Sequence, residues 1–363
     1  MAITCGIVGL PNVGKSTLFN ALTAARVPAE NYPFCTIEPN VGVVPVPDQR
    51  LDVLFDIVKP QKKVPTTVEF VDIAGLVDGA SRGEGLGNRF LAHIRETNAI
   101  AHVVRSFEND DVARVAASID PVGDIETVNT ELALADFESV DRQLVKAERD
   151  AKTNEKRAVA IRDFLEKVKA HLDGGLPVRS LDLSDKERPL LGDLHLITAK
   201  PVMYVANVDE NGPGQDPQVH AVRELAKKEG AEVVVICAAV EAEIAQLDDP
   251  DKAEFLRDFG LEEPGLDRVI HCAYRLLNLQ TFFTTNEKEV HAWTTRIGAL
   301  APRAAREVHT DMERGFIRAE VVSYDDFVEG HGEHGAREAG RLRLEGKDYI
   351  VQEGDVIRFR FNV

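Results

Sequence analysis

Eight residues near the amino terminus have the spacing of a phosphate-binding loop. The sequence Gly9-Leu-Pro-Asn-Val-Gly14-Lys15-Ser16 fits the pattern G-x-x-x-x-G-K-[ST], with an apolar run before it and helix-forming residues after it. Glycines let such a loop curl until its backbone N–H groups point at phosphate oxygens, with the positive end of the next helix behind them. Lys15 would neutralise the β and γ phosphates, and the Ser16 hydroxyl suits Mg²⁺, which prefers oxygen ligands. The pattern predicts a triphosphate site with these nucleotide contacts: Asn12, Val13, Gly14, Lys15, Ser16 and Thr17.

A second element of the same chemistry lies at residues 68–75, which read as a strand ending in D-x-x-G. Here the Asp72 carboxylate can orient waters on Mg²⁺, and the Gly75 amide can meet the γ phosphate. Thr36 lies in the loop between the two elements, where its hydroxyl can complete the metal shell while the γ phosphate is present. An ordinary loop threonine is the alternative. We therefore expect Ser16, Thr36 and Asp72 as metal ligands.

The base is expected at Asn207-Val208-Asp209-Glu210, directly after an apolar run at 202–206. GTPases commonly carry N-K-x-D, whose final Asp accepts hydrogen bonds from two guanine donors. In this chain valine replaces the lysine, and the last carboxylate sits on a side chain one methylene longer. The displaced carboxylate loses the bidentate fit, so guanine loses its advantage. We expect ATP, with Asn207, Val208 and Glu210 near the base; GTP read by Asp209 in a shifted register is the alternative.

The predicted site lacks the usual residue that activates the attacking water. Leu76 follows the D-x-x-G pattern, where Ras-like enzymes carry a glutamine that orients the attacking water. An isobutyl group cannot do so, so hydrolysis must be assisted from elsewhere or stay slow. Lys15 and Gly75 are the catalytic candidates that the phosphate-binding residues themselves provide.

The elements that must position these residues alternate along the chain. Short β-branched runs separated by helical segments predict a doubly wound, mostly parallel α/β sheet, with strands at 3–8, 41–46, 68–72, 100–105, 202–206 and 233–237. Residues 124–173 contain no Gly or Pro, and their apolar residues step by three and four on both sides of Thr153 and Asn154. This pattern predicts an antiparallel helical hairpin; one continuous helix is the alternative.

After a last helix at 265–276 the pattern changes to that of a small α+β domain. Strand candidates at 281–284, 290–294, 317–322 and 356–361 accompany one helix near 302–308. The predicted divisions are a nucleotide-binding domain at 1–123 and 200–277, an inserted helical hairpin at 124–199, and a C-terminal domain at 278–363.

Composition limits the partners. The 363 residues carry a formal charge of -18, so the average surface repels nucleic acid and anionic lipid. We therefore expect no sequence-specific DNA binding. RNA would need a local basic patch, and scattered solvated charge is the alternative reading of the candidates Arg337, Arg341, Arg343, Lys347, Arg358 and Arg360.

The chain has neither a signal peptide nor an apolar run of membrane-spanning length, and its four cysteines form no C-x-x-C pair. We expect a cytoplasmic protein without a membrane partner. His331 and His334 lack further ligands nearby and do not predict a metal site.

Taken together, these strings resemble the YchF branch of the Obg-like ATPases, within the translation-factor-like P-loop nucleoside triphosphatases. The resemblance covers essentially the whole chain. It implies that a nucleotide domain, interrupted by a helical hairpin, is followed by a TGS domain at 278–363, a ubiquitin-like β-grasp module. It also implies the ribosome as partner and strengthens the case for ATP. The strings are C-G-I-V-G-L-P-N-V-G-K-S-T (5–17), D-I-A-G-L (72–76), G-E-G-L-G-N (83–88), N-T-E-L-A-L-A-D (129–136), L-E-G-K-D-Y (344–349) and F-R-F-N-V (359–363).

Two further expectations follow from the resemblance. Asn12 occupies the position of the K⁺-ligand asparagine of potassium-activated relatives, so K⁺ is a candidate second cofactor that would stabilise the transferring charge. The family's catalytic His follows F-E-N-D, but after Phe107-Glu-Asn-Asp this chain carries Arg114 where that His aligns. Arg114 is either a positive finger or a solvated loop residue.

The sequence thus predicts a slow, Mg²⁺-dependent ATP hydrolase that acts as a ribosome-associated switch. A nucleotide-gated binding module with incidental turnover is the alternative from another class. A metabolic kinase is disfavoured, because the D-x-x-G switch and the C-terminal module resemble those of regulators.

Overall fold

The computed structural model describes residues 3–24, 40–73, 86–107, 119–210, 216–247, 249–258 and 261–362. These residues form two compact units. The first unit takes the described residues up to 24, then 40–42 and 69–273. The second takes 43–68 and the described residues from 274 onward.

One six-stranded sheet has the strand order β2-β4-β1-β5-β6-β7. Strand β1 pairs in parallel with β4 and β5, and β5, β6 and β7 continue in parallel. Every residue of β5 and β6 is buried, as expected for parallel strands covered on both faces. The predicted α/β sheet is confirmed. Its strands are β1 (Thr4–Val8), β2 (Val41–Pro45), β4 (Thr67–Asp72), β5 (Ala99–Arg105), β6 (Val202–Asn207) and β7 (Glu232–Ile236).

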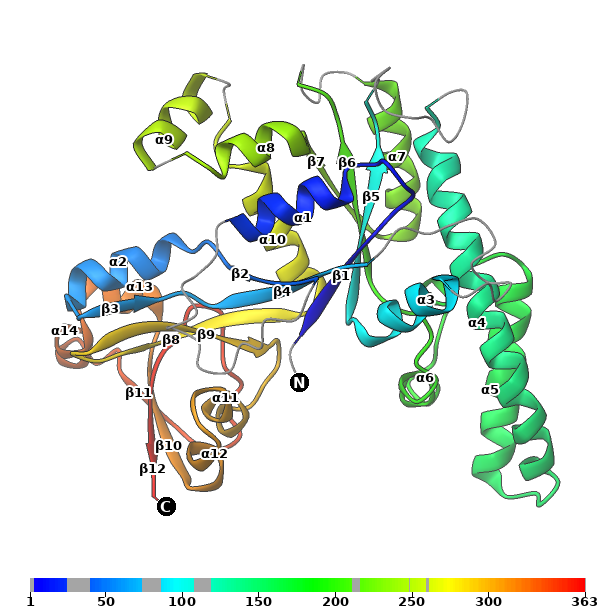
Figure 1. Cartoon of the computed structure of the whole chain (residues 1–363). Helices are drawn as coiled ribbons and strands as arrows, with labels where there is room; N and C mark the ends of the chain where they lie inside the picture. Colours follow the sequence, from blue (N-terminus) through cyan, green and yellow to red (C-terminus); the bar gives the residue numbers. More distant parts are fainter. Residues whose placement is uncertain are drawn as a thin grey trace. The chain divides into compact units, whose positions relative to one another are not determined.

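Helices cover both faces of this sheet. Figure 1 shows α1 and α10 on one side of the strands and α3, α4 and α7 on the other. The helices of this part of the chain are α1 (Lys15–Ala24), α3 (Leu86–Glu96), α7 (Pro217–Glu229), α8 (Ala238–Ile244), α9 (Asp249–Asp258) and α10 (Gly265–Leu276).

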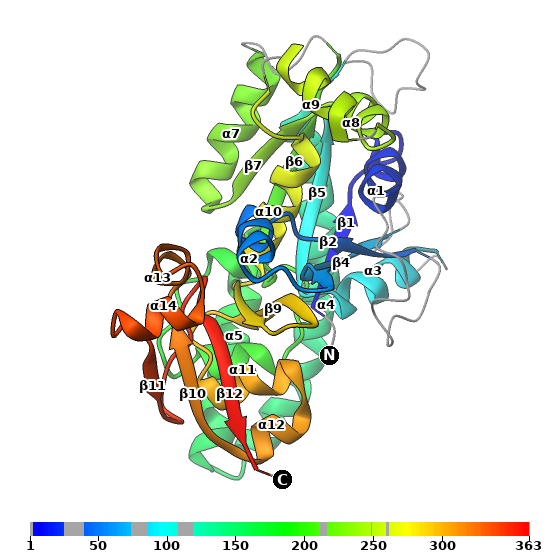
Figure 2. The ribbon, with the colours of Figure 1, turned by 90° about the vertical axis from the view of Figure 1, so that its left-hand side faces the viewer.

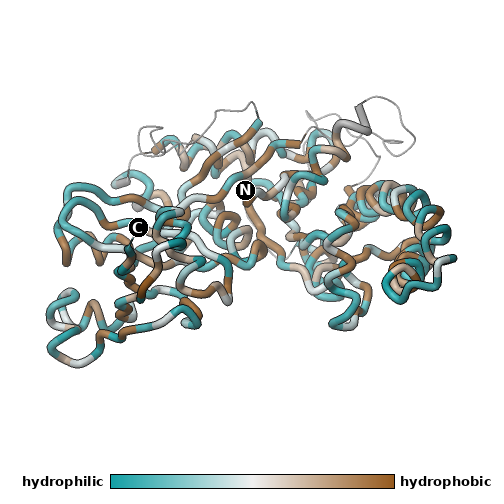
Figure 3. Tube along the Cα trace, turned by 90° about the horizontal axis from the view of Figure 1, so that it is seen from below, coloured by the Kyte–Doolittle hydropathy of each residue, from teal (hydrophilic) through white to brown (hydrophobic). Residues whose placement is uncertain are grey.

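The insertion is a helical hairpin of α4 (Pro121–Ala151) and α5 (Lys156–Asp173), so the alternative of one continuous helix is wrong. Asn154 adopts a left-handed conformation with φ 57° in the turn between them. Valine, leucine and phenylalanine side chains of both helices form a shared core. In Figure 3 hydrophobic residues alternate with hydrophilic ones along each helix, as that packing requires. Leucines of residues 181–194, which include the short helix α6 (Arg188–Gly192), pack against the same core.

The second unit holds a mixed six-stranded sheet in the order β11-β10-β12-β8-β9-β3. One core lies under α11 and α12, and another lies under α2 and α13. Figure 2 shows these helices with β10 and β12. The strands are β3 (Lys62–Val64), β8 (Leu279–Thr285), β9 (Glu289–Arg296), β10 (Phe316–Val322), β11 (Arg343–Glu345) and β12 (Val356–Phe361). The helices are α2 (Gln49–Val58), α11 (Ala301–Val308), α12 (Thr310–Arg314), α13 (Tyr324–Glu329) and α14 (Glu333–Glu338).

The compact units divide the chain differently from the predicted boundaries. Residues 43–68, expected within 1–123, belong to the second unit, because β3 pairs with β9 and α2 buries Leu51 and Leu54 in a core that contains Phe283. The insertion belongs to the first unit rather than standing apart, and α4 begins before the expected residue 124, with Asp120 as its N-cap. A local sequence pattern shows that a helix needs an apolar partner, but not which sheet provides it.

Among the residues that the structure describes, no helix is long and apolar enough to cross a membrane.

Candidate nucleotide site

The phosphate loop connects β1 to α1 in the geometry that its glycines allow. Gly14 has φ 96°, a conformation that residues with a side chain rarely adopt, and Asn12 has φ 63°. A Cβ on Gly14 would lie 2.3 Å from Nδ2 of Asn207, so the loop also needs glycine for close approach. The amide of Leu18 donates to the Gly14 carbonyl at 3.0 Å and continues the backbone into α1. The sequence therefore folds into the predicted loop before the amino end of a helix.

Lys15 is buried inside this loop. Its ammonium group donates to the carbonyl oxygens of Gly9 at 2.9 Å and Leu10 at 2.6 Å. Burial lowers the pKa of Lys15 to about 8, and the attraction of Asp72 opposes this shift. Two carbonyls are weaker partners for an ammonium group than a polyphosphate, so the lysine is positioned to exchange them for a ligand.

Two of the three predicted metal ligands lie in the described residues. Ser16 lines the pocket with an exposed side chain in the first turn of α1. Asp72 ends β4, where burial raises the pKa of its carboxyl group and Lys15 opposes this shift. Thr36 and Gly75 lie outside the described residues, as do Leu76 and Arg114. The ends of β4 and of the phosphate loop thus provide a carboxylate and a hydroxyl, both hard oxygen donors that fit Mg²⁺.

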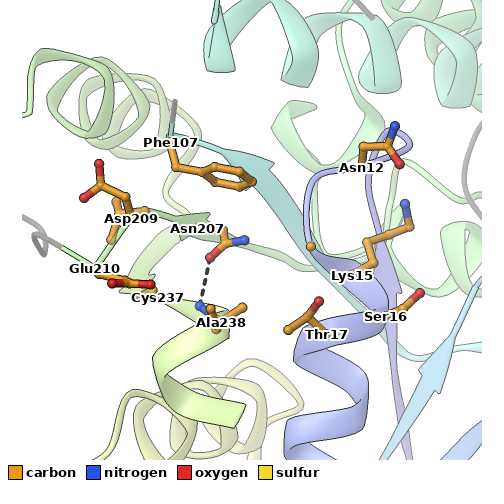
Figure 4. A pocket seen from close by; sticks show the side chains of 13 residues that line it. Asn12, Lys15, Ser16, Thr17, Phe107, Asn207, Asp209, Glu210, Cys237 and Ala238 are labelled. Atoms are coloured by element: carbon orange, nitrogen blue, oxygen red, sulfur yellow. Dashed lines mark hydrogen bonds between the residues drawn. The ribbon is translucent and has the colours of Figure 1, made fainter. Parts of the chain in front are cut away.

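Asn207 joins three segments at the carboxyl end of β6. Its Nδ2 donates to the Val13 carbonyl at 3.0 Å, and its Oδ1 accepts from the Ala238 amide at 2.9 Å, the bond drawn in Figure 4. The Asn207 backbone carbonyl also accepts from the Ser106 amide at 2.8 Å. The side chain is 5% exposed. We expected Asn207 near the base; it lines the pocket, and its amide is engaged in holding the loops together.

A pocket of ≈ 730 Å³ lies between these loops. It is large enough for a nucleotide, because small-molecule sites in proteins span roughly 300–1,000 Å³. Figure 4 shows Phe107, Asp209 and Glu210 on the side opposite Lys15 and Ser16. The lining residues are Asn12, Gly14, Lys15, Ser16, Thr17, Phe107, Asn207, Val208, Asp209, Glu210, Cys237, Ala238 and Ala239. Eight of the predicted site residues therefore line one cavity, whereas Val13 and Asp72 are not in its lining.

The residues that the sequence pattern missed lie at the carboxyl ends of neighbouring strands. Phe107 follows β5, and Cys237, Ala238 and Ala239 follow β7. Open α/β sheets bind ligands outside the carboxyl ends of their strands, so the strand order would have indicated these positions. The guanidinium of Arg105 lies 4.7 Å from the centroid of the Phe107 ring.

The backbone N–H of Val208, expected near the base, is bonded within the protein. Its amide donates to the Ile236 carbonyl at 2.8 Å, and its side chain is buried with Val219 and Val235. The N–H of Val208 is therefore not available to a base.

The histidine pair and the candidate basic patch both lie in the second unit. His334 pairs with Glu338 at 3.3 Å, and the described residues hold no group of three or more metal-ligating side chains. Most of the candidate basic patch is neutralised within the second unit. Its ion pairs are Arg337 and Arg358 with Glu333, Arg341 with Asp326, Arg343 with Glu345 and Asp355, and Arg360 with Glu320.

Comparison with known proteins gives consistent results. Residues 4–159 match a family described as 50S ribosome-binding GTPase, and residues 279–362 match YchF-GTPase_C, described as a protein of unknown function. The chain is 60% identical to the ribosome-binding ATPase YchF of Haemophilus influenzae over 363 residues, which is 100% of both chains. It is 53% identical to the protein of that name from Bacillus subtilis over 366 residues, again covering 100% of both. The solved structure titled as the Schizosaccharomyces pombe YchF GTPase matches with a TM-score of 0.90 and 34% identity, over 99% of this chain and 97% of that one.

Proposed function

Because this chain belongs to the YchF family, we propose that it binds ATP with Mg²⁺, hydrolyses it, and uses the reaction to switch its binding to the ribosome. The observation that supports this proposal most directly is the composition of one cavity. It combines the phosphate loop with Asn207, which matches the asparagine of the guanine-reading pattern, and with Val208 and Glu210, which replace its lysine and aspartate. The names of the relatives include both ATPase and GTPase, so the choice of base rests on the pocket itself.

The base end of the pocket favours adenine. Adenine carries an exocyclic amino group, a donor, at the ring position where guanine carries a carbonyl oxygen. The Val208 carbonyl is an acceptor, and its N–H is occupied by Ile236, so this residue suits a donor on the base. Glu210 replaces the shorter aspartate that would grip guanine with two hydrogen bonds. The Phe107 ring offers an apolar surface beside the base.

The phosphate end favours a metal-bound triphosphate. Ser16, Thr36 and Asp72 would hold Mg²⁺, which neutralises charge on the phosphate oxygens when it is bound. Lys15 leaves its two carbonyl partners to bind the β and γ phosphates, and the Gly75 amide donates to the γ phosphate. Water then attacks the γ phosphorus, and the bond to the oxygen shared with the β phosphate breaks, which releases phosphate and ADP. K⁺ beside Asn12 would stabilise the charge on the transferring phosphate.

The second unit fits a partner-binding role. We assign residues 278–363 to a TGS domain of the β-grasp type, supported by a mixed sheet with helices on both faces. The structure adds β3 and α2, from residues 43–68, to the same unit. Ribosomes as partners imply a cytoplasmic location.

Calorimetric titration of the full chain with Mg–ATP and Mg–GTP tests the proposal. We expect ATP to bind at least about tenfold more tightly, since one bidentate hydrogen-bonding site is worth a few kcal/mol in base selection. Lys15→Ala should remove detectable binding of either nucleotide while the protein stays folded. A clear preference for GTP, or full affinity in Lys15→Ala, would contradict the assignment.

Turnover distinguishes the switch from its alternative. If hydrolysis drives the cycle, purified ribosomes should stimulate phosphate release. If the chain is a nucleotide-gated binding module, ribosome binding will depend on ATP without any stimulation of turnover. Detection of phosphate on a small acceptor molecule would instead favour a kinase.

A further inference from the structure

One carboxylate of the hairpin is fully buried, away from the residues that line the nucleotide pocket. Asp136 on α4 is 0% exposed. Its Oδ1 accepts from the Ile197 amide at 2.9 Å, and its Oδ2 accepts from both the amide and the hydroxyl of Thr198 at 2.7 Å. These bonds fasten the long helix to the residues that lead into β6.

The segment that follows α5 is hydrogen-bonded to the same residue, Thr198. The Thr198 hydroxyl accepts from the Val178 amide at 3.2 Å, and its backbone carbonyl accepts from the Arg179 amide at 2.9 Å. The outgoing helix and the returning segment therefore meet at one buried threonine, which closes the base of the hairpin.

A second attachment lies on the same face of α4. Asn129 precedes Asp136 by seven residues, about 10 Å along the helix axis. Arg179 donates to the Asn129 side chain at 3.4 Å and to Glu229, the last residue of α7, at 3.1 Å. Tyr204 of β6 donates to the same Glu229 oxygen at 2.7 Å. Two attachments two turns apart prevent α4 from pivoting on the sheet.

The same segment is tied to the helix that follows the D-x-x-G strand. Lys200 lies two residues before β6, and its ammonium group donates to the Arg95 carbonyl at 3.0 Å and to the Thr97 carbonyl. These carbonyls lie at the end of α3, the first element described after Asp72. The residues before β6 thus hold α3 through Lys200 and α4 through Thr198, while the far end of β6 carries Asn207 in the pocket.

We propose that this cluster, the hairpin anchor (Asn129, Asp136, Arg179, Thr198 and Lys200), couples the nucleotide state to the position of the helical hairpin. The inference rests on the proposed function, because it needs a nucleotide cycle to report. A ligand in the pocket contacts Asn207 at the end of β6, and α3 is joined through Lys200 to the residues just before the same strand. Both elements meet at the anchor, so a shift of either is passed to α4 as a rigid body. A partner that binds the hairpin would then bind the two nucleotide states with different affinity.

Hydrogen–deuterium exchange of the full chain tests the coupling. The readout is α5, which contributes no residue to the nucleotide pocket. In the unaltered protein, saturation with a non-hydrolysable ATP analogue should change exchange in α5 by at least about twofold relative to the ADP-bound protein. Asp136→Asn keeps the shape of the side chain but turns one acceptor into a donor that faces a backbone N–H. This variant should lose the response in α5 while its ATP dissociation constant stays within about threefold.

A matched control lies on the same helix. Asp141→Asn makes the same chemical change at an exposed carboxylate that pairs with Lys169 of α5, and it should keep the full response. Lys200→Met removes the hydrogen bonds to the end of α3 and the attraction between Lys200 and Asp136, and it should lose at least half of the response, which provides a test if Asp136→Asn does not fold.

The possible results distinguish a failure of the coupling from a failure of the proposed function. The inference would be overturned if exchange in α5 of the unaltered protein did not depend on the nucleotide although ATP binds. It would also be overturned if a folded Asp136→Asn or Lys200→Met variant kept the full response. Failure of the proposed function would appear earlier, as absence of ATP binding in the unaltered protein.

Discussion

The side-chain amide of Asn207 donates a hydrogen bond to the carbonyl oxygen of Val13, 3.0 Å away, across 194 positions of sequence. The same side chain accepts a bond from the Ala238 amide. One buried amide therefore sets the distance between the phosphate loop, the end of β6 and the start of α8. Asn207 therefore fixes the position of the phosphate loop relative to the residues at the opposite end of the pocket.

Replacement of Asn207 should weaken nucleotide binding more than it weakens the fold. Asn207→Ala removes both side-chain hydrogen bonds and leaves a buried acceptor and a buried donor without their partner. Such losses cost about 1–3 kcal/mol, which corresponds to roughly tenfold or more in the ATP dissociation constant. Calorimetry measures the affinity and thermal unfolding checks the fold. Asn286→Ala is the matched control, because its side chain accepts from two backbone amides in a turn of the second unit; it should leave ATP affinity unchanged.

Gly14→Ala should disable the site through sterics. The φ of 96° disfavours any side chain, and the added methyl group would lie 2.3 Å from Asn207 Nδ2. We expect at least tenfold weaker ATP binding. Gly192→Ala makes the same change in α6 with no atom within 4 Å, and it should bind ATP normally and be as stable or slightly more stable. Equal affinities for the two variants would contradict the proposed role of the loop geometry.

Turnover should depend on the monovalent cation if K⁺ stabilises the transferring phosphate beside Asn12. We expect faster phosphate release in KCl than in NaCl at equal ionic strength, and Asn12→Ala should remove the difference while ATP still binds. A steady-state phosphate assay measures both rates. Equal rates in the two salts for the unaltered protein would exclude K⁺ from the mechanism.

The second unit should lose stability as the pH falls from about 6.5 towards 4. Burial lowers the pKa of His291 to about 4, so between these values the unfolded chain binds the proton that the folded chain refuses. Stability therefore rises with pH across this window. Trp293 reports it, because it is the single tryptophan of the chain and stacks on His291 with ring centroids 3.6 Å apart.

Urea unfolding followed by Trp293 fluorescence at several pH values measures this effect. His291→Phe keeps a stacked ring without a titrating group and should flatten the dependence. The exposed His220 on α7 is the control, and His220→Phe should behave as the unaltered chain does. An unchanged slope in His291→Phe would remove this histidine from the explanation.

Local chemistry made the phosphate loop, the strand that ends at Asp72 and the hairpin predictable. Each has a pattern that few other structures satisfy: glycines at fixed spacing before Lys15, a β-branched run before the aspartate, and apolar steps of three and four around Asn154. Phe107 and Cys237 were not predicted as pocket residues, because the residues next to them along the chain do not indicate a contact with the nucleotide. They line the pocket only because β5 and β7 lie on either side of β6.

The sequence by itself determined the class of fold and the segment that forms the phosphate loop, because the loop's conformation and its donors come from one continuous segment. Tertiary structure alone decided that residues 43–68 join the second unit, that Asn207 connects loops, and that Asp136 closes the base of the hairpin. Buried polar groups must find partners wherever the fold brings a donor or an acceptor, and those partners lie tens to hundreds of residues away.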